Sequence, residues 1–321
     1  MKLTADYHIH SNNSRFKISK SSIAEIARRA NSLGLREVAI TDHGYKHIFA
    51  ADKQKLLAAR DEIFDLNASL GTNVLLGIEA DILSENGDID VDDETLAAID
   101  ILIIGYHKMI KTDFASYFGK QKLSHIEIER ATDAYVNAIK RYDVDIVAHP
   151  GKGLKVDLYR LGKTCAEYNV LIEINNRHCD YTESEIRDLI RSGCQFVVSS
   201  DAYGAEQVGK VDNAMLLIEK YDIPSDRIVN VEYGDRYKSE LDREIEEDLK
   251  RYEKLIKKQN KSASFDELSD ETEYKLRAIA KEKGLQLEEI KNDKIDYKEL
   301  LTEEERAIVE RAEEFLRKNK R

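Results

Sequence analysis

Short apolar runs alternate with helix-patterned segments over the first 235 residues of the chain. Seven of these runs are rich in Val, Ile and Leu and polar only at their ends, a pattern typical of buried parallel strands. Strands that alternate with helices in this way predict an α/β protein with a parallel sheet, either open or closed into a barrel. The runs lie at residues 3–9, 36–42, 72–80, 98–107, 144–150, 169–175 and 194–201, and residues 227–232 form a candidate eighth.

The segment between the first two runs shows how a helix is specified here. Ser21 or Ser22 can cap its amino end, and Gly34 can end it. Apolar residues recur between them at helical spacing, so we predict an amphipathic helix that buries one stripe. The stripe consists of Ile23, Ile26, Ala27, Ala30 and Leu33.

From residue 236 onward the apolar runs give way to dense alternating charge. Residues 302–321 open with a capping box, Thr302 to Glu305, and the whole tail is patterned as helix. We therefore predict a barrel domain at residues 1–235 and a charged helical extension at 236–321. The extension contains no histidine or cysteine, so we expect it to supply no metal ligand. Its apolar stripe would either pack on the barrel or serve an oligomer or a protein partner.

The composition of the chain bears on its partners, its cysteine chemistry and its location. The net charge of −12 disfavours long nucleic acid as a partner, because an acidic surface repels the phosphate backbone. The three cysteines form no CxxC pair, so neither a disulfide framework nor a zinc cluster is expected. No apolar stretch approaches membrane-spanning length, and no apolar signal region follows the initial Met. We expect a soluble, cytoplasmic protein without a membrane partner.

Nearly every predicted strand ends in a residue that can bind a metal ion. His8 and His10 are two residues apart, so on a strand both side chains point to the same edge. The carboxyl ends of the strands of a closed α/β barrel meet at one face, where sites are built. Imidazoles and carboxylates gathered there, without enough cationic side chains to neutralise them, indicate divalent cations. The residues at the other strand ends are Asp42, His43, Glu79, His107, His149, Glu173 and Asp201.

These motifs resemble those of the polymerase and histidinol phosphatase (PHP) superfamily of metal-dependent phosphoesterases, in particular its small stand-alone bacterial phosphatases. In chain order they read DYHIH, ITDHG, GIEAD, GYHK, AHPGK, IEINN and SSDA. The resemblance implies a distorted (β/α)7 barrel with a site for two divalent ions, and leaves a third ion open. It implies that Glu79 bridges the two ions. The remaining ligands would be His8, His10 and Asp201 for the first ion, and His107 and His149 for the second.

The chain departs from the family pattern around the third ion, for which only His43 matches a ligand. Residues 12–15, where the family usually has His or Asp, read Asn-Asn-Ser-Arg, and Tyr203 stands where the family has a histidine. We therefore expect no ion to be held tightly at this position. We hypothesise that Arg15 presents positive charge to the substrate phosphate there, with Tyr203 as a hydroxyl donor. The alternative, that Arg15 points to solvent and the third site has been lost, stays open.

Other polar residues near the strand ends allow more than one interpretation. We expect Asp6 to orient a ligand histidine rather than to bind metal. Glu173 would contact the substrate or only satisfy loop backbone. His47 follows His43 by four residues and would supply a replacement ligand if this segment were helical, but we favour a surface position. For His178 we favour a position away from the site.

The predicted reaction is hydrolysis of a small phosphorylated metabolite at a phosphomonoester bond. A hydroxide shared by the two metal ions would attack phosphorus in line. His43 would donate a proton to the leaving group if the third ion is absent. Lys108, Lys152 and Arg177 are candidate phosphate clamps, or else ordinary solvated charges.

The ligand types suit Zn, Mn or Fe and do not choose among them. Two other functions are considered for this sequence. An amidohydrolase-type barrel also opens with an HxH pair, but it usually needs a bridging lysine, and Glu79 takes that role here. The second rival is a catalytically degenerate metal-binding barrel that acts as a scaffold or regulator through its helical tail.

Overall fold

The computed structural model describes residues 1–14, 19–108, 110–114 and 124–233. The chain divides into two units, Met1–Tyr237 and Lys238–Arg321, and the described residues all belong to the first. The predicted helical extension, including Thr302 and Glu305, therefore lies outside the described residues.

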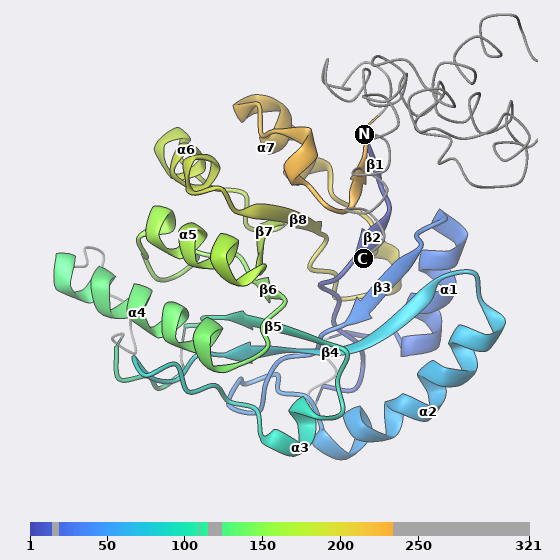
Figure 1. The fold of residues 1–321 in the computed structure, drawn as a ribbon. Helices are drawn as coiled ribbons and strands as arrows, with labels where there is room; N and C mark the ends of the chain where they lie inside the picture. Colours follow the sequence, from blue (N-terminus) through green and yellow to red (C-terminus); the bar gives the residue numbers. More distant parts are fainter. Residues whose placement is uncertain (15–18, 109, 115–123, 234–321) are drawn as a thin grey trace, which may run out of the picture. The chain divides into compact units, whose positions relative to one another are not determined.

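Seven parallel strands form the main sheet, in the order of the chain, and helices cover its outer side (Figure 1). The sheet curls until its two outermost strands meet. Just beyond them, Ile9 pairs with Ala202 in a parallel bridge, and the amide of His10 donates to the Ala202 carbonyl at 2.8 Å. The expected distorted (β/α)7 barrel is confirmed. The strands are β2 (Ala5–Asp6), β3 (Glu37–Ile40), β4 (Asn73–Asp81), β5 (Ile101–Gly105), β6 (Ile146–Val147), β7 (Leu171–Asn175) and β8 (Gln195–Ser199).

The first and the candidate eighth apolar runs differ from the prediction. The first run divides into β1 (Lys2–Leu3) and β2, and its histidines lie just beyond the strand in extended chain. The candidate eighth run forms β9 (Val231–Glu232), which pairs antiparallel with β1 outside the barrel. This antiparallel pair connects the first and last strands of the barrel domain and adds no eighth strand to the barrel.

The helices follow the strands in the alternation that the sequence predicts. The first, α1, is capped by Ser22 in a full capping box and ends at Gly34 with φ +70°, as expected. Four of its five stripe residues are buried, and Leu33 is the exception. Among the described helices, none is long and apolar enough to cross a membrane. The α-helices are α1 (Ile23–Leu33), α2 (Lys53–Ser69), α3 (Asp93–Leu96), α4 (His125–Arg141), α5 (Leu158–Tyr168), α6 (Glu183–Ser192) and α7 (Asp212–Tyr221), and the 3-10 turns are η1 (Ala205–Gln207) and η2 (Ser225–Arg227).

Side-chain alternation along the strands separates two apolar layers. On β5, Leu102 and Ile104 belong to the large cluster that packs against the helices, whereas Ile101 and Ile103 belong to a small second cluster. The small cluster fills the barrel interior, and its buried members are Ala39, Ile101, Ile103, Ile146, Ala148 and Val197. On β4, Ile78 and Ala80 are also in the outer cluster. Glu79 between them must therefore point inward, above the interior plug.

Candidate metal centre

Glu79 lies at the centre of the strand-end cluster and is fully buried. Its two carboxylate oxygens face different histidines. Oε2 lies 3.2 Å from His8 Nε2 and 3.8 Å from His10 Nε2, while Oε1 lies 3.0 Å from His149 Nε2 and 3.5 Å from His107 Nε2. Ligand atoms that each lie about 2.1 Å from one ion are about 3–3.5 Å apart. One carboxylate thus stands between two sets of nitrogen donors.

Asp201 completes the set on the side of His8 and His10. Its Oδ1 lies 3.3 Å from His10 Nε2 and 4.0 Å from His8 Nε2. Asp201 adopts φ +52° and His149 adopts φ +28°, values that are uncommon for residues other than glycine. Both residues end barrel strands, where the left-handed turn re-aims their side chains. Such conformations cost free energy and persist where the surroundings hold them, often at functional sites.

Several ligand atoms of this cluster are buried without a hydrogen-bond partner among the described residues. They are His8 Nε2, both ring nitrogens of His10, His43 Nδ1, Glu79 Oε2 and Asp201 Oδ1. An unsatisfied buried polar atom is costly, and such atoms are rare in native proteins. Because these atoms converge on one another and are mixed N and O donors, the cluster fits divalent metal ions.

Two further carboxylates hold the histidines in place. Glu173 Oε1 lies 2.8 Å from His8 Nδ1, and its Oε2 accepts from the His149 amide at 2.8 Å. Asp81 Oδ1 lies 2.9 Å from His107 Nδ1. Carboxylates that bond the far nitrogen of a ligand histidine fix its tautomer and ring orientation. Asp81 was missed by sequence reasoning, although its position two residues after Glu79 puts both side chains on one face of β4.

The expected role of Asp6 is wrong. Its carboxylate accepts from the amides of Ser200 and Gly209 at 3.0 and 2.9 Å, and so fastens the end of β8. The histidine-orienting role that we expected of Asp6 belongs to Glu173. The Asp42 carboxylate likewise accepts hydrogen bonds from the amide and the hydroxyl of Ser11, at 2.7 and 2.6 Å, and from none of the described histidines.

The charges of the cluster are strongly coupled. Burial alone would raise the pKa of Glu79, but His8, His107 and His43 outweigh burial and hold its pKa well below the usual range. Burial would lower the pKa of His107, but Glu79 and Asp81 raise it to about 9. Glu79, Glu173 and Asp201 therefore stay ionised at ordinary pH, and protonated histidines or bound cations can balance their negative charge.

His43 sits between Glu79 and Tyr203. Its Nδ1 lies 2.7 Å from Glu79 Oε2, and its Nε2 lies 2.9 Å from the Tyr203 hydroxyl. Burial, followed by the charge of His10, lowers the pKa of His43 to about 3. A neutral imidazole at ordinary pH suits a ligand or a hydrogen-bond acceptor better than the proton donor that we expected.

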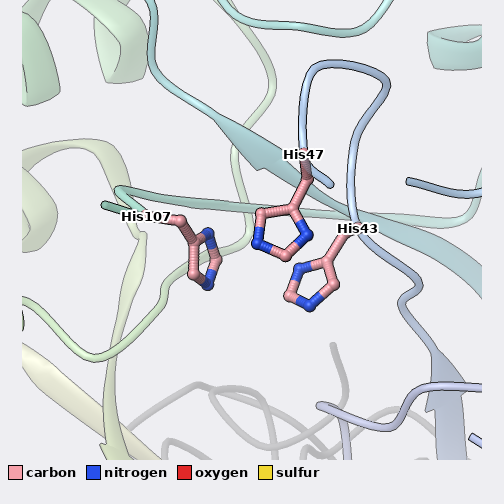
Figure 2. A group of neighbouring side chains, drawn as sticks. All are labelled: His43, His47 and His107. Carbon is pink, nitrogen blue, oxygen red and sulfur yellow. The ribbon is translucent and has the colours of Figure 1, made fainter. Parts of the chain in front are cut away.

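His47 lies in the cluster, and our prediction of a surface position is wrong. Its ring is 3.7 Å from that of His43 and 4.7 Å from that of His107, centroid to centroid (Figure 2). The segment that carries His47 is a turn rather than a helix, closed by a bond from its amide to the Gly44 carbonyl. These three imidazoles form another group with metal-ligand spacing. Because Asp81 occupies His107 Nδ1, the other nitrogen of His107 would have to serve either this group or the Glu79 group.

Comparisons with known proteins agree with this geometry. A model of the PHP domain matches residues 6–309. The chain belongs to the PHP domain family. A protein named "Probable phosphatase" from Thermoanaerobacter sp. is 30% identical over 251 residues, which cover 73% of this chain and 93% of that protein.

Another "Probable phosphatase", from Shewanella loihica, is 30% identical over 247 residues, covering 72% of this chain and 90% of that protein. Among solved structures, a histidinol phosphate phosphatase from Lactococcus lactis, complexed with zinc, L-histidinol and phosphate, aligns with a TM-score of 0.46 and 16% identity. That alignment covers 69% of this chain and 94% of the other.

A cavity of about 490 Å³ opens over the candidate metal centre. Arg177 lies on its rim, with its guanidinium 4.5 Å above the Tyr203 ring and 3.4 Å from the Asp201 carbonyl. His178 lines the same cavity, 5.2 Å from the His149 ring, so our prediction that it lies away from the site is wrong. No sequence signal beyond its place after β7 pointed to His178.

The other residues predicted to contact the substrate do not line the cavity over the candidate metal centre in the described structure. Lys108 and Lys152 line a smaller neighbouring cavity instead. Arg15 lies outside the described residues, so the hypothesis about its role remains a prediction.

Proposed function

We propose that this PHP protein is a metal-dependent phosphatase that hydrolyses small phosphomonoesters. One observation carries the proposal: Glu79 presents its two oxygens to two different sets of nitrogen donors, with several ligand atoms left unsatisfied. A carboxylate in that position can bridge two cations. The names of the relatives, probable phosphatases that match over most of their length, support the same activity.

Two groups of residues would hold two divalent ions. His8, His10 and Asp201 form one group, and His107 and His149 form the other, with Glu79 common to both. Divalent ions held there supply Lewis acidity, which neutralises charge on phosphoryl oxygens and makes water nucleophilic near neutral pH. Glu173 and Asp81 keep His8 and His107 oriented, and their charge raises the basicity of the rings.

Residues around the larger cavity would bind and orient the phosphoryl group. The Arg177 guanidinium lies on the rim of this cavity against Tyr203 and the Asp201 carbonyl, with its Nε 4.0 Å from Asp201 Oδ2. A guanidinium matches two phosphate oxygens with two parallel hydrogen bonds. The volume, about 490 Å³, lies in the range of small-molecule sites. The substrate class that fits is a small phosphorylated molecule.

The test is hydrolysis by the full-length protein after removal of metal and reconstitution with Zn, Mn or Fe. We expect p-nitrophenyl phosphate to be hydrolysed with at least one metal, and the diester bis-p-nitrophenyl phosphate much more slowly. Metal content should be about two ions per chain. If the protein binds metal but hydrolyses none of a panel of phosphomonoesters, the scaffold alternative holds and the proposal fails.

A further inference from the structure

A second cavity of about 210 Å³ adjoins the one over the metal centre, and His149 and His178 line both. Its other walls are the turn after β6, residues 150–153, and the segment between β7 and α6. Its lining is mostly polar, with Lys108 and Lys152 as its two cationic side chains. A substrate whose phosphoryl group occupies the larger cavity can reach the smaller one across His149 and His178.

Glycines in this turn shape the smaller cavity. Gly151 and Gly153 have φ of +88° and +73°, values that side-chain-bearing residues rarely adopt. The alkyl chain of Lys108 lies across Gly153, where an added Cβ would be 3.3 Å from its Cε and 3.4 Å from its Cγ. The turn thus supports the stem of Lys108 and directs the chain along the cavity wall.

Two lysines and two carboxylates, Asp180 and Glu185, line the smaller cavity, but the carboxylates leave the lysines largely available. Lys108 makes no ion pair with any of the described residues. Lys152 Nζ lies 3.7 Å from Asp180 Oδ1, but the Asp180 side chain is 80% exposed, and such a solvated pair is weak. The other acidic lining residue, Glu185, makes no ion pair with either lysine; its Oε2 accepts from the amide and hydroxyl of Thr182 at the start of α6. An incoming anion would therefore meet two available ammonium groups.

The position of these lysines separates their role from that of Arg177. Arg177 lines the larger cavity with the metal ligands, whereas Lys108 and Lys152 line only the smaller one. We infer that the smaller cavity binds a second anionic group of the substrate, so that the substrate is a phosphomonoester that also carries a carboxylate or a second phosphate. This inference rests on the proposed phosphatase function and specifies the class of its substrate.

A three-compound series tests the inference with the full-length, metal-loaded protein. Propane-1,3-diol monophosphate carries a hydroxyl at its far end, 3-phosphooxypropanoate carries a carboxylate there, and propane-1,3-diol bisphosphate a phosphate. The four- and five-carbon homologues extend the reach. We expect kcat/KM for a carboxylate or phosphate member to exceed that of its hydroxyl counterpart at least tenfold. Which of the two is preferred identifies the anion.

Substitutions in the lining of the smaller cavity test whether this cavity causes the preference for a second anionic group. Lys108→Met and Lys152→Met should each reduce, severalfold, the ratio of kcat/KM for the carboxylate or phosphate compound to kcat/KM for its hydroxyl counterpart. Asp180→Asn, which removes the competing carboxylate, should raise the ratio. Lys155→Met is the matched control, because Lys155 is an exposed lysine of the same loop that does not line the cavity. Metal content should be the same in all four variants.

Binding of non-hydrolysable phosphonates separates this inference from the proposed function. By calorimetry, 4-phosphonobutanoate should bind more tightly than 4-hydroxybutylphosphonate, and Lys108→Met should remove the difference. If no phosphomonoester is hydrolysed but this difference persists, the phosphatase proposal fails and the anion site stands. Equal kcat/KM across the series at every chain length, or a preference that survives in the Lys108→Met, Lys152→Met double variant, would overturn the inference.

Discussion

The histidines of the site fall into two sets that differ in how the fold places them. An inner set, His8, His10, His43, His107 and His149, lies at strand ends, and each has a nitrogen within 4 Å of the Glu79 carboxylate. An outer pair, His47 and His178, lies in loops and packs on inner histidines, and His178 Nε2 also lies 3.6 Å from Asp201 Oδ2. The inner set owes its position to strand register, and the outer pair to turn geometry. We therefore expect the histidine ligands of the two metal ions to come from the inner set, and the outer pair to modulate the activity of the metal centre.

Glu79→Gln should have the largest effect, because one substitution removes the negative charge shared by the whole inner set. We expect kcat/KM for phosphomonoesters to fall at least about a thousandfold, about 4 kcal/mol of barrier. Metal analysis should find the content reduced below two ions per chain. Glu167→Gln, an exposed change on α5, is the control and should leave both unchanged. A Glu79→Gln variant that keeps more than about a tenth of the wild-type rate would refute the central role of this carboxylate.

Glu173→Gln should have an intermediate effect, because Glu173 acts on the inner set through His8 and the His149 amide. Loss of a carboxylate partner of a ligand histidine typically costs about 10–100-fold in metal affinity or activity. The measurement is metal affinity by competition with a chelator, together with kcat at saturating metal. A purely structural role would lower thermal stability without changing metal affinity.

The inner set could be predicted from sequence because each member lies at or just after the end of an apolar run that is patterned as a strand. Seven such runs predicted a parallel sheet, and the resemblance to the PHP superfamily implied the closed barrel that brings their ends to one face. Glu79 was recognisable for the same reason. The same alternation along β4 places Asp81 on the face of the strand that carries Glu79.

The rest could not be predicted because it depends on turns. His47 returns to the cluster through a turn at Gly44 rather than through helical spacing, and His178 reaches the rim from the loop after β7. The partner of Asp6 is backbone from β8, nearly two hundred residues along the chain. Contacts at such separation depend on how the barrel closes, which no local pattern records.

His47→Ala should have a small effect if the outer pair only modulates the site. We expect the metal content to stay at the wild-type value and kcat/KM to fall no more than about tenfold, because the ring contacts His43 and His107 without reaching Glu79. His125→Ala, on the exposed start of α4, is the matched control. Loss of one metal equivalent in His47→Ala would move His47 into the metal-binding set and break the division between inner and outer histidines.

Asp90 joins the two sets and predicts a pH dependence, the smallest of the expected effects. Its Oδ1 accepts from the Asp81 amide and its Oδ2 from the Lys46 amide, both at 2.8 Å, so one carboxyl group ties the loop of His47 to the end of β4. Burial, with a further contribution from the charge of Asp81, raises the pKa of Asp90 from 3.8 to about 7. Between these two pH values, the folded protein keeps a proton on this group that the unfolded chain has released.

Asp90 should therefore lower the free energy of unfolding of the metal-free protein as pH rises from about 4 to about 7, by up to about 1.4 kcal/mol per pH unit. Its stabilising contribution is fully present below the unfolded pKa and is lost as pH rises through the folded pKa. His43, His47 and His178, whose pKa values burial lowers to about 3, 3 and 4, act with the opposite sign over much of this range, so the Asp90 contribution is read from the difference between wild type and Asp90→Asn. Asp90→Asn cannot titrate, so the amount by which its free energy of unfolding falls below that of the wild type, measured by urea unfolding, should shrink as pH rises from about 4 to about 7. The slope is the measurement rather than the absolute stability, because Asn keeps only one carbonyl oxygen for the two amides and will lower stability at every pH. The same pH slope in Asp90→Asn as in the wild type would mean that Asp90 does not titrate in this range, and that the loop of His47 is tied to β4 without a protonated Asp90.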